Sequence, residues 1–266
     1  MFEIFAYKFM QTAFIAATLV AVLCATFGLF IVLRKLSFIT DGIAHISLSG
    51  IALALATHVN VLAVTLAVAI ASGLGINRLR EKLKLSGDTA IGLMFPVGLA
   101  AGIILLSLAK ATSIDITTYL FGSILAISEA DLWAILVFGA VVLAAVLLLR
   151  KQLLYIAFDE ESARASGLPV TAINYAFFAL IGATVVLSVR IAGILLISSL
   201  VIAPPSAALQ LKKSFKTTLI LSCIFGVVSA WSGITASYYL GIPTGAAIAI
   251  SSFAIFLAAY LLRPGK

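Results

Sequence analysis

Charged residues are scarce in this sequence. Asp, Glu, Lys and Arg make up 10% of its 266 residues, against about 25% in an ordinary soluble domain. Hydrophobic residues make up 63%. Because such a chain cannot keep most of its surface in water, a water-soluble globular protein is excluded. The composition instead predicts an all-α, polytopic membrane helical bundle that forms one domain over residues 1–266.

Motifs for chemistry on the chain itself are also missing. The sequence has no Gly-x-x-x-x-Gly-Lys-[Ser/Thr] phosphate loop and no Ser/His/Asp or Cys/His set arranged for nucleophilic catalysis. We therefore predict no catalytic residues and no permanently bound cofactor. The two cysteines, Cys24 and Cys223, lie within apolar runs and are expected to pack as small hydrophobic side chains. Active transport by this chain would need an ion gradient or a separate ATPase chain.

The positive charges are clustered. A net charge of +7 would suit nucleic acid, but Lys and Arg lie in short groups between apolar runs, as the positive-inside rule describes. We therefore expect membrane lipid and no nucleic acid as a partner. Nine spans place nearly every basic cluster on one side, with the N-terminus outside and the C-terminus cytoplasmic. The expected spans cover about residues 10–33, 37–57, 61–76, 89–109, 131–149, 172–189, 191–211, 217–239 and 246–262.

The number of spans stays open between eight and nine, because residues 110–130 are less apolar and are expected to form an outer, partly re-entrant segment. Residues 152–171 form the longest polar loop. Pro96 is expected to kink its helix, and Pro204 and Pro205 are expected to break theirs.

An ionisable pair interrupts the second apolar run. Residues 37–49 read SFITDGIAHISLS, and Asp41 and His45 are four positions apart, so they share one helix face. At about 1.5 Å per residue, His45 lies roughly 12 Å into a hydrocarbon layer about 30 Å thick. A carboxylate and an imidazole at that depth form part of a metal site or of a proton relay. The simpler alternative is that Thr40 or Asp41 caps the helix and His45 bonds within the bundle.

One helix supplies only two metal ligands, whereas zinc prefers about four. A twofold-symmetric dimer would bring two Asp and two His side chains together around one axis. Ser, Thr or water could instead complete the site within one chain.

A second polar feature is FDEESARASGLP at residues 158–169. It predicts a short cytoplasmic helix at about residues 159–168. Asp159 can cap its start, and Glu160 and Glu161 suit the positive end of its dipole. Gly167 and Pro169 mark its end. Such a helix can dock on a cytoplasmic partner, and a solvated connector is an equally weighted alternative.

The sequence resembles a known family through these stretches. They are residues 32–51, which contain Asp41 and His45; DTAIG at 88–92; TYLFG at 118–122; and residues 158–169 followed by AGILLISSLVIAP at 192–204. Together they resemble the integral membrane permeases of bacterial zinc, manganese and iron uptake ABC transporters, and with their spacing they cover nearly the whole chain.

The resemblance implies a type II-like ABC importer permease in a prokaryotic inner membrane. It implies three kinds of protein partner: a second permease, identical or paralogous; two cytoplasmic ATPase subunits; and an extracytoplasmic metal-binding protein. The transported ion would be zinc, manganese or ferrous iron. Asp41 and His45 stand at positions that face the translocation path in such permeases. The ATPase-coupling helix would correspond to a segment that contains Asp159, Glu160, Glu161, Ala163, Ser166, Gly167 and Leu168.

One position departs from the family pattern. Many relatives have Ser-His-Ala where this chain has Ala44-His45-Ile46. Ser47 is then the candidate for a hydroxyl group close to the metal ligands.

Two other functions fit the residues. A secondary, proton-coupled cation transporter would use Asp41 and His45 as a relay, and a membrane scaffold or receptor would transport nothing. A neighbouring ATPase gene would favour the importer. Transport that follows the proton gradient and does not need ATP would favour the first alternative.

Overall fold

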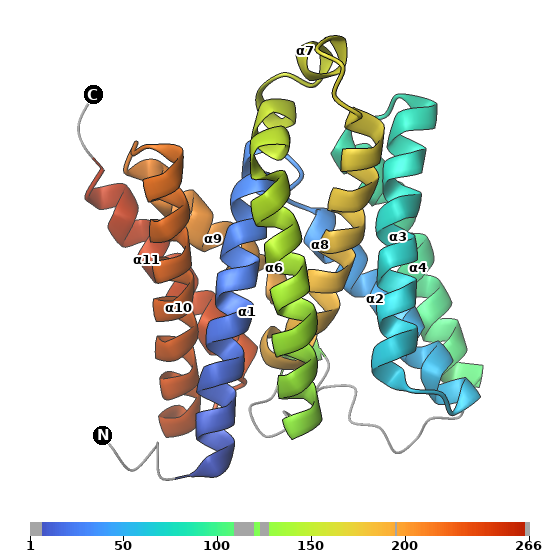
Figure 1. Ribbon diagram of the computed structural model, residues 1–266. Helices are drawn as coiled ribbons and strands as arrows, with labels where there is room; N and C mark the ends of the chain where they lie inside the picture. The colour runs from blue at the N-terminus through green and yellow to red at the C-terminus, as the bar shows by residue number, and fades with distance from the viewer. Residues whose placement is uncertain (1–6, 109–119, 123–127, 195, 264–266) are drawn as a thin grey trace. The chain divides into compact units, whose positions relative to one another are not determined.

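The computed structural model describes residues 7–108, 120–122, 128–194 and 196–263, and within these ranges its regular structure is entirely α-helical (Figure 1). The all-α prediction is therefore confirmed. The helices are α1 (Lys8–Leu33), α2 (Ile39–Thr57), α3 (Val61–Leu83), α4 (Gly87–Leu108), α6 (Glu129–Phe158), α7 (Glu160–Ala165), α8 (Val170–Ala192), α9 (Ile197–Gln210), α10 (Phe215–Leu240) and α11 (Thr244–Leu261).

Eight of the described helices are long and apolar enough to cross a membrane, namely α1, α2, α3, α4, α6, α8, α10 and α11. Helix α9 has 14 residues and reaches only about 21 Å at 1.5 Å per residue, short of a hydrocarbon core about 30 Å thick. The ninth predicted span, residues 191–211, is thus a short helix. The predicted outer segment at residues 110–130 falls largely outside the described residues.

The chain packs as two compact units, each built from segments that are distant in the sequence. One unit contains Met1–Val32, Ile116–Leu143 and Leu187–Lys266, and the other contains Leu33–Asp115 and Ala144–Val186. Helices α6 and α8 contribute residues to both. We call the second the α2–α4 unit. A single domain over residues 1–266 stays a prediction.

Helix α2 is one of the buried helices of the α2–α4 unit. It packs against α3 and α4, and the contact with α4 depends on glycine. A Cβ atom on Gly102 would lie 2.9 Å from the backbone nitrogen of Ser49, and one on Gly98 would overlap Ile46. In contrast, the buried residues of α4 are only Ala90, Ile91 and Gly102. Helix α4 therefore lies at the margin of this unit and α2 lies inside it.

Two helices extend beyond their predicted ends. The predicted span 61–76 continues to Leu83 as α3, with Arg80 and Lys82 in its last turn, where positive charge is favourable for the helix dipole. The span 131–149 continues to Phe158 as α6. The predicted long loop at 152–171 was therefore wrong: its first half is helical and buries Leu153 and Ile156.

The expected break at Pro204 and Pro205 was also wrong. Both lie inside the continuous helix α9, and the interruption comes earlier, at Gly193, whose φ angle is +78°. Proline lacks an N–H group, so Pro205 leaves the Val201 carbonyl without its usual helical partner. That carbonyl packs directly on α1 at Gly28, where a Cβ atom would overlap the Val201 oxygen and lie 2.9 Å from Pro205 Cγ. A close contact between backbones takes the place of the predicted break.

The two cysteines pack within the unit that contains α1 and α10. Both are free thiols. Cys24 Sγ lies 3.3 Å from Ser188 Oγ, and Cys223 Sγ lies 3.7 Å from Thr26 Oγ1. Cys24 is fully buried, as expected for a small hydrophobic side chain, and Cys223 is partly exposed.

Candidate functional site

Helix α2 exposes a narrow polar stripe. Asp41, His45 and Ser49 are each partly exposed, while the residues between them, 42–44 and 46–48, are all buried. Spacing by four places the three side chains on one face. We call Asp41, His45 and Ser49 the α2 stripe. The sequence-based expectation that Asp41 and His45 share one face therefore agrees with the geometry.

The capping alternative for this stripe is wrong. Helix α2 begins at Ile39, and its N-cap residue is Phe38, whose side chain makes no capping hydrogen bond. Thr40 and Asp41 both lie inside the helix. His58 holds the structural position at the other end: it is the C-cap, with φ +55°, and its N–H donates to the Ala54 carbonyl.

His45 lies against an aromatic side chain of α4. The imidazole and the Phe95 ring meet edge to face, with 4.9 Å between their centroids. Asp41 and His45 interact electrostatically. The buried Nδ1 atom of His45 has no hydrogen-bond partner among the described residues. An imidazole in this state keeps a nitrogen that can donate a proton or bind a ligand.

The hydroxyl expected near this pair is not the one that the sequence suggested. Ser47 is fully buried, and its Oγ donates to the Ala44 carbonyl at 2.6 Å. It follows His45 by two residues, which turns it roughly 200° away around the helix. Ser49 is the hydroxyl on the same face as His45, and its Oγ donates to the Ile46 carbonyl at 2.6 Å. Extending the four-residue spacing of Asp41 and His45 by one more turn would have predicted Ser49.

The stripe does not form a complete metal site by itself. No group of three or more His, Cys, Asp or Glu side chains capable of holding a metal ion occurs in the described ranges. Two protein ligands from one helix are fewer than the three or four of typical zinc centres. A further His, Cys, Asp or Glu ligand would have to come from undescribed residues or from another chain, and water or a hydroxyl such as that of Ser49 could also contribute.

The predicted cytoplasmic helix is present as α7, between α6 and α8 (Figure 1). Asp159 caps its start: its carboxylate accepts from the Ser162 N–H at 2.9 Å and from the Ser162 hydroxyl at 2.5 Å. These donors hold the pKa of Asp159 below its usual value. At the other end, Gly167 has φ +86°. Local sequence signals therefore define α7 at both ends.

The end of α7 is a Schellman motif. The Leu168 N–H donates to the Ala163 carbonyl at 3.2 Å, and the Gly167 N–H donates to the Arg164 carbonyl at 3.1 Å. The Ser166 hydroxyl also donates to the Ala163 carbonyl, at 2.9 Å. Ala163 is fully buried, whereas Glu161, Ser166 and Gly167 are exposed. One face of α7 is thus anchored and the other is open.

Glu160 provides the anchor, through contacts that the sequence did not reveal. Its carboxylate forms an ion pair with Arg80, at the end of α3, with 2.6 Å between Oε2 and Nη2. Its other oxygen accepts from Asn174 Nδ2 on α8 at 3.2 Å and lies 3.6 Å from Arg164 Nη2. Glu160 therefore joins α7 to both α3 and α8.

Arg34 extends this network to the start of α2. Its Nη2 donates to Asn174 Oδ1 at 2.5 Å, and its guanidinium lies 4.9 Å from the centroid of the Phe177 ring. Burial, with Arg80 nearby, lowers the pKa of Arg34 to about 10, although Glu160 acts in the opposite direction. We call Arg34, Arg80, Glu160 and Asn174 the α7 network.

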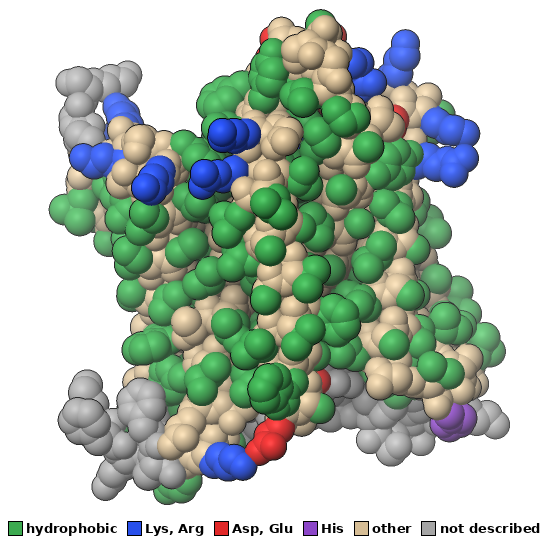
Figure 2. All heavy atoms as spheres, viewed as in Figure 1, with side chains coloured by type: hydrophobic (Ala, Val, Ile, Leu, Met, Phe, Trp, Pro, Cys, Tyr) green, Lys and Arg blue, Asp and Glu red, His purple; other side chains and the backbone are tan. Residues whose placement is uncertain are grey.

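A polar cleft of about 490 Å³ lies beside the α7 network. Its walls include Arg34, Arg80 and Glu160 together with Asp88 at the start of α4. In Figure 2 the Lys and Arg side chains of this unit gather at the end that carries α7. From the sequence alone, Arg34 and Arg80 were interpreted only as basic residues that mark the cytoplasmic side of the membrane. An asparagine in the apolar run after Pro169 was the one hint that they have buried partners.

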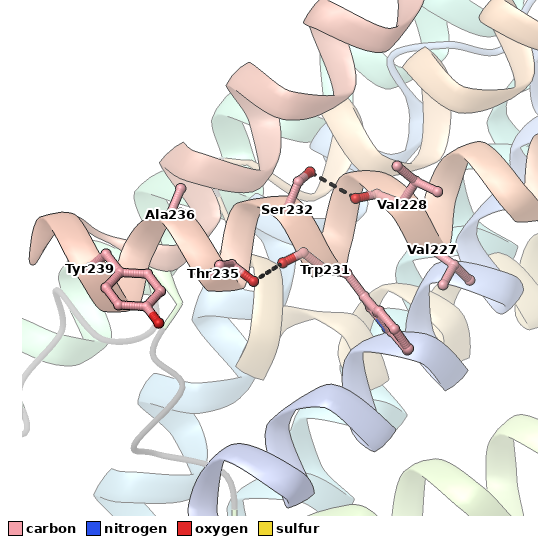
Figure 3. Close-up of a pocket in the computed structure, with 7 residues that line it drawn as sticks. All are labelled: Val227, Val228, Trp231, Ser232, Thr235, Ala236 and Tyr239. Carbon is pink, nitrogen blue, oxygen red and sulfur yellow. Dashed lines mark hydrogen bonds between the residues drawn. The ribbon is translucent and has the colours of Figure 1, made fainter. Parts of the chain in front are cut away.

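A second surface hollow has a different chemistry. A groove of about 610 Å³ is lined by seven α10 residues (Figure 3): Val227, Val228, Trp231, Ser232, Thr235, Ala236 and Tyr239. Two of its three hydroxyls donate to their own helix, from Ser232 to the Val228 carbonyl at 2.7 Å and from Thr235 to the Trp231 carbonyl at 2.8 Å. None of the seven carries a charge. The groove resembles a lipid-facing helix surface.

Several known proteins are similar to this chain over nearly its whole length. A probable metal transport system membrane protein of Treponema pallidum is 35% identical over 251 residues, which cover 94% of each chain. The manganese transport system membrane protein MntC of Halalkalibacterium halodurans is 31% identical, over 98% of this chain and 90% of that protein. The structure of PsaBC from Streptococcus pneumoniae in complex with Fab matches with a TM-score of 0.86 and 30% identity, over 97% of this chain and 93% of that one.

The family model agrees with the geometry described above. The model of the ABC 3 transport family matches residues 6–263, a range that includes every helix in the described part of the chain. This match accounts both for the long apolar helices of the chain and for its predicted resemblance to metal-uptake permeases. The chain therefore belongs to the ABC 3 transport family.

Proposed function

We propose that this chain is the permease of an ATP-driven importer that moves a divalent transition metal ion into the cytoplasm. The observation that carries the proposal is the α2 stripe. Between Ile39 and Gly50 helix α2 is otherwise buried, and there it presents a carboxylate and an imidazole on its one partly open face. Ionisable groups are costly in a membrane, so they mark ion pathways more often than packing surfaces. The names of the relatives from Treponema and Halalkalibacterium support metal as the cargo.

In the proposed mechanism, Asp41 and His45 bind the passing ion together with ligands from a second permease copy. The carboxylate and the imidazole suit zinc, manganese and ferrous iron alike. Two ligands from each of two chains would give about four, a common number in metal sites. Because no chain closes the site alone, the ion would stay exchangeable, as transport requires.

The energy for transport would come from a separate ATPase that docks on α7. Its exposed face, which carries Glu161, Ser166 and Gly167, is available to a partner. The ion pair between Glu160 and Arg80 fixes the opposite face. A metal-binding protein on the outer side would deliver the ion. The family supports these partners, and the exposed residues of α7 support the docking of the ATPase.

The proposed orientation puts α7 and the C-terminus in the cytoplasm and the N-terminus outside. It rests on the basic residues of the α2–α4 unit, which gather at the end that carries α7 (Figure 2), as the positive-inside rule expects. Reporter fusions placed after residue 266 test it. A C-terminal alkaline phosphatase that is active in the periplasm would contradict the orientation.

The function is tested with the permease co-purified with its ATPase and reconstituted in vesicles. We expect uptake of radiolabelled manganese or zinc that requires ATP and is lost when the ATPase cannot hydrolyse it. The matched control is the same vesicle with a proton gradient and no ATP. Uptake driven by that gradient alone would overturn the ABC mechanism in favour of a proton-coupled transporter. Absence of uptake under both conditions would favour a scaffold or receptor.

A further inference from the structure

We propose that Arg34 is a positioning residue through which a movement of α7 reaches the start of α2, and with it Asp41 and His45. The inference rests on the proposed function, since it describes how the ATPase would control the metal-binding face. It assigns to the α7 network a task beyond holding α7 in place.

The contacts form one continuous chain from α7 to α2. Glu160 on α7 pairs with Arg80 at 2.6 Å and accepts from Asn174 at 3.2 Å. Asn174 in turn accepts from Arg34 at 2.5 Å. The amide of Asn174 thus uses its nitrogen toward Glu160 and its oxygen toward Arg34. A shift of Glu160 changes the orientation of the amide, and so the position of the guanidinium.

Arg34 is close in sequence to the α2 stripe. Helix α1 ends at Leu33 and α2 begins at Ile39, so only four residues separate Arg34 from the helix that carries Asp41. This connection is fixed at several points. Leu36 is buried, the Ile39 N–H donates to the Leu36 carbonyl at 3.0 Å, and Leu36 packs against Gly87. A short, packed connection transmits a displacement that a long flexible loop would absorb.

Charge makes Arg34 sensitive to the position of Glu160. Arg34 and Arg80 are close enough to repel each other, and the Glu160 carboxylate offsets that repulsion. Withdrawal of Glu160 would take an anion from Arg80 and a hydrogen-bond acceptor from Asn174. The two arginines would then be left near each other without the shared acceptor. Two like charges that lie close together in a partly buried site repel each other, so this arrangement is unfavourable.

The cleft beside the α7 network gives the Arg34 side chain room for a second position. Its Nη1 is buried without a hydrogen-bond partner among the described residues, so one of its donors is available. Asp88 lines the same cleft of about 490 Å³ and offers another carboxylate. Arg34 can therefore exchange partners in discrete steps, which is the property that a conformational link between two sites needs.

The test compares two variants with one control in the reconstituted permease–ATPase complex. Arg34→Gln removes the charge. Asn174→Asp keeps an acceptor for Arg34, and strengthens that bond with a charge, but repels Glu160. Arg78→Gln is the control, because Arg78 is an exposed arginine two residues before Arg80 on the same helix. Metal uptake, ATP hydrolysis, ATPase co-purification and thermal unfolding are measured for each.

We expect Arg34→Gln and Asn174→Asp each to lower the metal transported per ATP hydrolysed by about fivefold or more. The ATPase should still co-purify, and hydrolysis should continue. Arg78→Gln should behave as wild type, and Arg34→Lys should recover part of the ratio because it restores the charge. Asn174→Asp strengthens the bond to Arg34 and breaks the link to Glu160, so a lower transport ratio in a variant that keeps its unfolding temperature would report the broken link and not a weaker hold on Arg34.

Two results would overturn the inference. One is an unchanged ratio of transport to hydrolysis in both variants. The other is a fall in uptake that is matched by loss of the ATPase or by a lower unfolding temperature, which would make the network a structural anchor only. Failure of the proposed function looks different, because wild-type vesicles would then show no ATP-driven uptake at all.

Discussion

The α2 stripe and the α7 network are two polar clusters in the same unit, and they differ in how far the chain satisfies them. In the α7 network, one carboxylate contacts Arg80, Arg164 and Asn174. In the α2 stripe, the buried Nδ1 of His45 has no hydrogen-bond partner among the described residues. The chain gives three partners to the Glu160 carboxylate, which anchors the helix that would dock a partner protein, and it leaves an imidazole nitrogen open in the cluster that would hold a passing ion.

This difference follows from the physics of each task. A docking element needs a fixed shape, so its charges are bonded within the chain. A transport site has to release its ion, so a complete set of ligands in one chain would be a disadvantage. The predictions below test this contrast, from the largest expected effect to the smallest.

The largest effect is expected from loss of a stripe ligand. Asp41→Ala or His45→Ala should lower ATP-driven metal uptake by about 100-fold or more, since even changes to the partners of metal ligands cost about 10–100-fold. ATPase co-purification should be unchanged, because α7 is untouched. His58→Asn is the control, since His58 caps α2 and asparagine tolerates its positive φ angle. Uptake within about twofold of wild type for both alanine variants would show that the stripe is not a metal site.

A smaller effect is expected at the end of α7. Gly167→Val forces a branched side chain into φ +86°, although nothing lies within 4 Å of the added Cβ. The cost is conformational only, and it should weaken ATPase binding by about tenfold. Pull-down of the ATPase at several concentrations measures it. Gly241→Val carries the same kind of strain in open space at the end of α10, and it should leave ATPase binding unchanged.

Loss of the α7 cap should have a milder result. Asp159→Ala removes the acceptor of the Ser162 N–H and should lower ATPase binding by about threefold, whereas Asp159→Asn should be nearly neutral because asparagine caps equally well. Equal losses for the two variants would mean that the negative charge at 159, and not the cap, is what the partner needs.

The cap also predicts a pH response. Since the pKa of Asp159 is below its usual value when folded, its contribution to stability is complete above the unfolded pKa and falls only as the pH drops through the folded pKa. This group should therefore give no change in ATPase binding between about pH 6 and pH 8.

The smallest effect separates the two serines of α2. Ser47 and Ser49 both donate to a carbonyl three residues back, at 2.6 Å, so their local roles match. Ser49→Ala should lower metal affinity or uptake by about twofold, and Ser47→Ala should not. Isothermal titration of the assembled complex with manganese would measure both. The reverse order would restore Ser47 as the hydroxyl near the ligands.

How much the sequence could predict depended on the range of each interaction. Helix α7 was predicted almost to its ends, because Asp159 and Gly167 act within a few residues of themselves. The shared face of Asp41 and His45 followed from the helical repeat. The ion pair between Glu160 and Arg80 joins residues 80 positions apart, and no local pattern contains that information.

Two errors have the same origin. Pro204 and Pro205 were expected to break a helix because the local cost of proline was counted alone, yet packing of the Val201 carbonyl on Gly28 accommodates the loss. The extension of α6 to Phe158 was missed because its last turns are more polar, although Leu153 and Ile156 are buried by other helices. In both cases tertiary packing outweighed local preference.

The contact between Gly28 and α9 has a consequence for how such a sequence can evolve. A side chain at position 28 would overlap the Val201 oxygen and lie 2.9 Å from both the Val201 carbonyl carbon and Pro205 Cγ. Replacing Pro205 would offer the Val201 carbonyl an N–H partner, but it would not remove the α9 backbone from this place. Position 28 can therefore gain a side chain only if α9 moves away from α1. Descendants should retain glycine at position 28 for as long as the two backbones stay in contact, whatever residue stands at position 205.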